Sequence, residues 1–158
     1  DRKILAEFQA KVGELQRAVT GATKIANDVK GKIALWKKSL HDTPNAPTKL
    51  RDDVKSIEEK NREMLIALSS DNTLRSRNEG TPPSINERID GIINDQWLST
   101  TSPTETHRKA YEIAGEEFVP LLAKLRTLVE VDVKNFEAAL ENAGAPWTPG
   151  RLPEWKQK

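Results

Sequence analysis

Apolar side chains recur alternately three and four positions apart through the first quarter of the chain. This seven-residue rhythm places them on one face of a long helix that packs lengthwise against other helices. The helix is predicted over residues 2–41, because the helix backbone does not easily accommodate Pro44 and Pro47. The residues of this stripe are Leu5, Phe8, Val12, Leu15, Val19, Ala22, Ala26, Val29, Ile33, Trp36 and Leu40.

Two shorter helices are predicted next. The second helix begins near Thr48 and fades after Leu68, and residues 70–83 form a long polar loop. The third helix begins at Ser84, because Glu87 stands three residues later, as in the reciprocal capping pair that satisfies free amide groups. This helix is short and ends near residue 99.

The fourth helix is long, and its two ends carry clear signals. Ser102 is the expected N-cap, with Pro103 at the first helical position and Glu105 at the third. Gly144 is expected to close the helix. Near Glu130 the apolar stripe drifts around the helix axis, so the pattern is less regular there than in the first helix.

The predicted fold class is all-α, an antiparallel up-down-up-down four-helix bundle with two long and two shorter helices and an extended Pro/Trp-rich C-terminal tail. Short connections at residues 42–47 and 100–102 make the first helix antiparallel to the second, and the third antiparallel to the fourth. The length of the loop at residues 70–83 leaves the direction of the third helix open, and the Trp36 to Trp97 distance tests it. We expect residues 1–143 to form the bundle. Residues 144–158 are expected to form a tail that packs on the bundle or on a neighbouring domain.

This arrangement predicts where the aromatic residues meet. Both termini share one end of the bundle, where Phe8 meets Phe136, and Trp36, Trp97 and Tyr111 cluster at the other end. Charge also predicts which helices are neighbours. The first 41 residues hold nine Lys or Arg against four Asp or Glu, whereas residues 104 to 143 hold five against eight. The two long helices are therefore expected to lie side by side.

Composition excludes several classes of function. The chain has 158 residues, and its 25 basic and 24 acidic residues leave a formal charge of +1. That balance argues against nucleic acid or anionic lipid as a partner, since both require a concentrated positive field. No segment approaches the roughly 20 apolar residues that cross a bilayer. The absence of cysteine excludes thiol catalysis and cysteine-bound metals. The chain begins without methionine, so we expect it to be part of a larger protein.

No catalytic, cofactor-binding or metal-ligating residues are predicted. The two histidines, His41 and His107, lack the Glu-x-x-His spacing of metal-binding bundles and are expected to be surface or capping residues. Adjacent carboxylates such as Glu116 and Glu117 point about 100° apart on a helix and do not converge on a substrate. No phosphate-binding loop, nucleophile triad or zinc spacing is present in the sequence.

The C-terminal tail is the unusual segment, because prolines alternate there with tryptophans and favour an extended path. In one interpretation, Trp147, Leu152 and Trp155 fold back over the bundle. In the other, the tail docks on a neighbouring domain or a partner, and Trp147, Arg151, Leu152 and Trp155 are the candidate interaction residues. Stacked tryptophans that hold a glycan are a third, weaker interpretation.

Several motifs in the second half resemble a known family. They are Pro82-Pro83, Ile85-Asn86-Glu87-Arg88-Ile89, Ser102-Pro103-Thr104, Phe118-Val119-Pro120-Leu121-Leu122, Asp132 before Phe136, and the run from Gly144 to Pro153. Together they resemble the C-terminal helical region of large bacterial proteins with an N-terminal β-propeller of BNR or sortilin (VPS10)-like repeats, often labelled glycosyl hydrolases. The resemblance implies a secreted, periplasmic or cell-envelope protein whose glycan chemistry resides in the propeller, because none of that family's catalytic residues maps onto this chain.

Two functions follow as hypotheses. The favoured one is a non-catalytic accessory or interaction domain that packs on the parent β-propeller or on another protomer, with the tail as a clasp. In the alternative, the domain completes the substrate site of a propeller glycosidase through the tail or through the loop around Arg75 and Arg77. Homodimerisation through Ile4, Ile25 and Leu35 is a further option.

Overall fold

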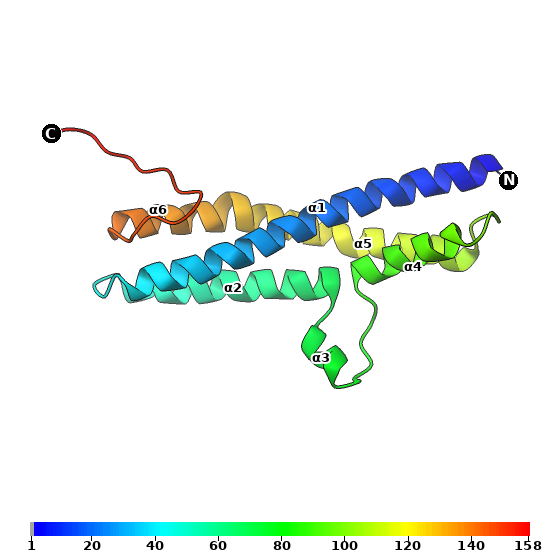
Figure 1. Cartoon of the computed structure of the whole chain (residues 1–158), viewed down its shortest axis with the longest axis horizontal. Coiled ribbons are helices and arrows are strands. Elements are labelled where there is room, and N and C mark those ends of the chain that lie inside the picture. Colours follow the sequence, from blue (N-terminus) through cyan, green and yellow to red (C-terminus); the bar gives the residue numbers. More distant parts are fainter. Residues whose placement is uncertain (1) are drawn as a thin grey trace.

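The computed structural model describes residues 2–158, which fold into helices and connecting loops without a strand in that range. The all-α prediction is therefore confirmed. The helices form three rods that lie side by side (Figure 1). The first rod is α1 (Arg2–His41). The second consists of α2 (Thr48–Ser69) and α4 (Ile85–Trp97), and the loop between these two helices carries the short helix α3 (Asn72–Ser76). The third rod is continuous and consists of α5 (Glu105–Thr127), the π-helix η1 (Leu128–Val133) and α6 (Lys134–Asn142).

The directions in which successive helices run differ from the prediction. α4 continues in the direction of α2 instead of turning back beside it, and the two termini lie at opposite ends of the molecule (Figure 1). The up-down-up-down four-helix arrangement with both termini at one end is thus corrected to three rods, the second of which is interrupted. The α1–α2 and α4–α5 pairs are antiparallel, as the short connections between them predicted.

Helix lengths explain this topology. α1 has 40 residues and extends about 60 Å at ~1.5 Å per residue. α2 and α4 have 22 and 13 residues, so they cover nearly the same length only when placed end to end. Folding α4 back beside α2 would leave the N-terminal half of α1 with only the third rod beside it. The end-to-end order places α2 or α4 against α1 along nearly its whole length and so increases the burial of apolar surface, which is the dominant favourable term in folding.

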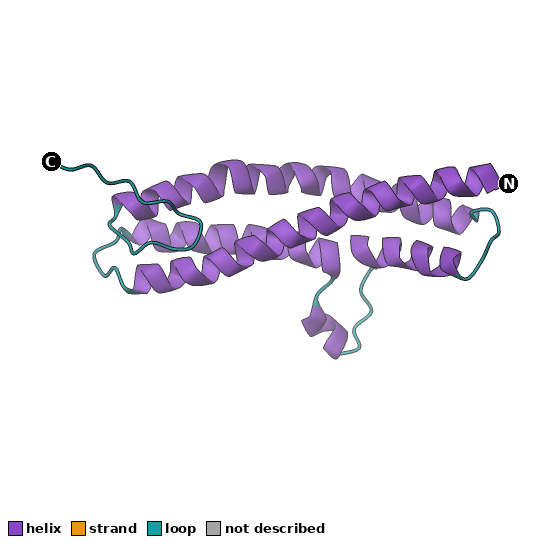
Figure 2. Ribbon diagram, turned by 45° about the horizontal axis from the view of Figure 1, so that its top comes forward, coloured by secondary structure: helices purple, strands orange, loops and turns teal. Residues whose placement is uncertain are grey.

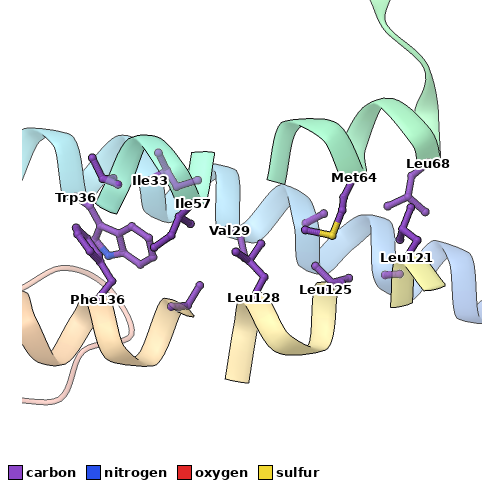
Figure 3. Packing of buried hydrophobic residues seen from close by; sticks show 14 of the residues in the cluster. Val29, Ile33, Trp36, Ile57, Met64, Leu68, Leu121, Leu125, Leu128 and Phe136 are labelled. Carbon is purple, nitrogen blue, oxygen red and sulfur yellow. The ribbon is translucent and has the colours of Figure 1, made fainter. Parts of the chain in front are cut away.

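The core is a single continuous seam between the rods (Figure 3). At one end the rings of Trp36 and Phe136 lie 4.8 Å apart, and at the other end Phe8 packs edge-on against Tyr111 at 5.9 Å. The predicted Phe8–Phe136 contact and the predicted cluster around Trp36 are therefore wrong, since α1 runs parallel to the third rod. Trp97 is 88 % exposed and joins no cluster.

Capping residues set the beginnings of α4 and α5. Ser84 and Glu87 form the predicted reciprocal pair, with Glu87 N donating to Ser84 Oγ and Ser84 N donating to Glu87 Oε2. The predicted cap at Ser102 is wrong. Thr104 caps α5 together with His107, whose ring also lies 3.2 Å from Asp95 on α4. The cap therefore lies two residues later than local sequence indicated, and its histidine also contacts α4.

The drift of the stripe near Glu130 marks the π-helix η1. Buried residues of the third rod are three or four positions apart, except for Leu128 and Val133, which are separated by five. A π-turn contains more residues than an α-turn. The wide turn therefore absorbs one extra residue and returns Phe136 and Leu140 to the buried face.

Candidate functional site

The C-terminal tail begins with a specific helix stop. Gly144 has φ +70°, its N–H donates to Glu141, and the N–H of Ala145 donates to the carbonyl of Leu140. These two bonds form a Schellman motif, in which a residue with positive φ ends the helix. Gly144 therefore closes the third rod as predicted, and it turns the chain back toward α1.

Residues 145–151 then fold over the end of the bundle (Figure 2). Ser39 Oγ, at the end of α1, donates a hydrogen bond of 3.0 Å to the carbonyl of Pro146. A tight turn follows, closed by Arg151 N–H donating to Thr148 O, with Pro149 and Gly150 at its two central positions. Gly150 has φ +86°, so the turn has the arrangement of type II, in which glycine is favoured at the third position.

Arg151 is the centre of this small structure, which we call the clasp (residues 145–151). Its side chain is only 8 % exposed. Nη1 donates to the carbonyl of Pro146 at 3.1 Å, and the guanidinium carbon lies 4.8 Å from the centre of the Trp147 ring, a cation–π contact. Trp147 itself is 46 % exposed, so its ring covers the arginine on one side and faces water on the other.

Beyond the clasp the chain leaves the bundle. Leu152 is 85 % exposed and Trp155 is 81 % exposed, and the tail runs away from the helices in both views (Figures 1 and 2). Residues 152–158 are exposed throughout and form no hydrogen bond with the rest of the described chain. Of the four candidate interaction residues, Trp147 and Arg151 are therefore brought together, whereas Leu152 and Trp155 project into solvent. In the first interpretation, Trp147, Leu152 and Trp155 all fold back over the bundle. The tail follows the bundle only as far as Arg151, so that interpretation is wrong for Leu152 and Trp155.

A charged pair between α1 and α6 lies beside the clasp. Lys32 Nζ on α1 lies 3.1 Å from Glu137 Oε1 on α6, which agrees with the predicted adjacency of the oppositely charged rods. The same ammonium group lies close to Gly150, at 3.8 Å from where a β-carbon would stand. Sequence spacing gave no signal for Lys32 or Ser39 as neighbours of the tail, because more than 100 residues separate the partners.

Grooves between the rods are open and carry mixed charge. One of about 780 Å³ lies between α2 and the third rod, with Met64, Leu121 and Leu128 among the residues that line it and the Lys60–Asp132 ion pair at its edge. A second, of about 820 Å³, lies between α1, α2 and the loop at Asp71. Within residues 2–158 no group of acidic or histidine side chains is arranged to hold a metal ion.

Two charged groups at the second groove, Asp71 and Arg62, have local partners. Asp71 caps α3, and the hydrogen bond from the backbone N–H of Thr73 to its carboxylate lowers the Asp71 pKa. Arg62 is bonded to Glu59 one turn before it, and this partner raises the arginine pKa. Both groups are therefore engaged in local structure.

Comparisons of the chain with protein-family profiles, with curated proteins and with solved structures found no match. In addition, none of the helices in residues 2–158 has both the length and the hydropathy needed to cross a membrane.

Proposed function

We propose that this chain is a non-catalytic interaction domain, a helical spacer that docks on another folded domain through its C-terminal tail. The observation that carries the proposal is the contrast within that tail. Its root is held by the clasp, while Leu152 and Trp155 are more than four-fifths exposed beyond it. Two large apolar side chains in water favour burial on a partner, each by roughly 1.5–3 kcal/mol when fully covered.

The fixed root supports docking energetically. Binding costs free energy for each segment that becomes ordered, and preorganisation reduces this cost. Because residues 145–151 are already held on the end of α1, only the last seven residues, which are exposed, would have to be fixed on the partner. Leu152 and Trp155 are also three positions apart, which places them on one edge if the proline-rich segment adopts a polyproline II helix.

The partner that we propose is a β-propeller of the same protein, in a secreted, periplasmic or cell-envelope setting. This part of the proposal is supported by the tail motif from Gly144 to Pro153, which resembles the C-terminal region of BNR and sortilin-like propeller proteins. The rods, about 60 Å long, would then act as a spacer with the tail as the attachment point. Another protomer is the alternative partner.

A binding experiment tests the role of the tail. The propeller domain is titrated with the full chain and with a chain that ends at Arg151, which retains the clasp and loses both exposed residues. We expect the truncation to weaken binding at least tenfold while leaving the melting temperature within about 2 °C. Trp97→Ala is the matched control, because its indole is equally exposed at the opposite end of the bundle. Equal binding by the full and shortened chains would contradict the proposal.

A catalytic assay tests whether the domain is non-catalytic. We expect pure, cooperatively folded chain to hydrolyse none of a panel of chromogenic glycosides, and turnover would refute the non-catalytic assignment.

The second candidate, completion of a glycosidase substrate site, is favoured by the half-exposed ring of Trp147, since indole rings can stack on sugars. Under that function, removing residues 144–158 from the full-length protein abolishes glycoside hydrolysis without loss of folding.

A further inference from the structure

The guanidinium of Arg151 has one edge without a partner. Nη1 is bonded to the carbonyl of Pro146, and the Trp147 ring lies near the guanidinium. Nε and Nη2 are shielded from solvent and have no hydrogen-bond partner in residues 2–158. The N–H bonds of these two nitrogens point in the same direction. They form the fork that binds the two oxygens of a carboxylate in parallel.

Leaving this edge unpaired is costly. A buried donor without an acceptor costs about 1–3 kcal/mol, and more when it is charged. Thr148 Oγ1, in the same turn, is a further buried polar atom without a partner. Glu137, the ion-pair partner of the Lys32 that lies beside Gly150, is engaged by that ammonium group. The described chain thus holds a donor edge, closed to solvent, that none of its own carboxylates accepts from.

The charged residues around the clasp favour a partner segment of negative charge. Residues 144–158 contain three basic side chains, Arg151, Lys156 and Lys158, against one acidic side chain, Glu154. Lys32 also lies beside Gly150, but its charge is balanced by Glu137. The tail itself is therefore net positive and attracts an acidic segment, even though the net charge of the whole chain is close to zero.

We propose that the Nε/Nη2 edge of Arg151 binds a carboxylate side chain from an acidic segment of the partner protein. This inference rests on the proposed function, because it specifies the chemistry of the surface that the tail docks on. The edge is shielded in the free chain, so entry of the carboxylate requires the tail around it to move. Trp147 lies directly beside the guanidinium and reports that movement.

The probe is a blocked hexaglutamate peptide, with blocked hexaglutamine and inorganic phosphate as comparisons. Binding to the whole chain is followed by nuclear magnetic resonance of the Arg151 Nε–H and of the four indole N–H groups. We expect hexaglutamate to shift the Arg151 and Trp147 signals together, while the Trp36 signal stays in place and hexaglutamine shifts neither. Phosphate that binds as tightly as hexaglutamate would overturn the assignment to a carboxylate.

Two variants separate the fork from general charge. Arg151→Lys keeps the positive charge and removes the bidentate edge, whereas Lys156→Gln removes an exposed charge of the tail and keeps the edge. We expect R151K to weaken hexaglutamate binding at least tenfold and K156Q to weaken it less than threefold, with both proteins folded by circular dichroism. Equal weakening by the two variants, or none by R151K, would overturn the inference.

The outcome remains distinct from that of the proposed function. If R151K binds the propeller normally while the chain that ends at Arg151 does not, the carboxylate site is wrong and docking through the tail stands. If neither change affects propeller binding, the proposed function itself is wrong.

Discussion

Deleting Val131 from the π-helix η1 is expected to be tolerated. The deletion shortens the five-residue interval between Leu128 and Val133 to four, the spacing of an ordinary α-helical stripe. The residues on both sides then keep their buried faces, and the Arg126–Glu130 pair is retained. The residue removed is about half exposed, so little apolar burial is lost. The free energy of unfolding should change by less than about 1 kcal/mol.

Deleting Lys24 from α1 is the matched control, because this helix has no wide turn to absorb the change. Lys24 is exposed, so its own side chain contributes little. Removing it rotates one half of α1 by about 100° against the other. The buried residues of α1 that precede the deletion then leave the core. They are Val12, Val19 and Ala22. At roughly 1.5–3 kcal/mol for each valine, the loss is at least about 3 kcal/mol.

Urea unfolding followed by circular dichroism at 222 nm measures both deletions. The midpoint should stay near that of the parent chain for the Val131 deletion and fall sharply for the Lys24 deletion. An unchanged m-value confirms that the same surface is exposed on unfolding. If the two deletions destabilise the chain equally, the extra residue in η1 has a packing role, and the explanation of the wide turn is wrong.

Two further predictions concern local structure. Gly144→Ala should destabilise the chain by about 1–2 kcal/mol, because alanine is strained at φ +70°. Gly21 lies in the middle of α1 with open space around it, so Gly21→Ala should stabilise the chain by roughly 0.5–1 kcal/mol in the same assay. The Asp71 pKa is lowered in the folded state, so the α3 cap is stabilising above the unfolded pKa and is lost as pH falls through the folded pKa. The Thr73 amide resonance should therefore move as pH is lowered through the folded-state pKa of Asp71, and Asp71→Asn should abolish that titration.

Local chemistry explains which elements could be predicted from sequence. The apolar stripe and the prolines after it define α1, Ser84 and Glu87 define the start of α4, and Gly144 defines the end of the third rod. Each signal depends on residues within one or two helical turns, so no knowledge of the rest of the chain is needed. The candidate interaction residues were found in the same way, from the unusual alternation of proline and tryptophan.

The exact N-cap of α5 was missed, because the pair that forms it has a histidine at the position where Glu or Gln is usual. Ser102 has every local feature of a cap, but Thr104 takes that role with His107, which also faces Asp95 on α4. The burial of Arg151 has a long-range origin. It depends on Ser39, more than 100 residues away, holding Pro146 on the end of α1.

The sequence by itself determined that this chain forms amphipathic helices, where most of them begin and end, and that the tail differs from the bundle. Only the tertiary structure decided that α4 continues the line of α2, and which side chains of the tail are covered. The 15 residues that separate α2 from α4 permit either direction for α4. The direction of α4 is decided by burial along the length of the long helices. This burial depends on contacts between rods, so no pattern within a single helix predicts it.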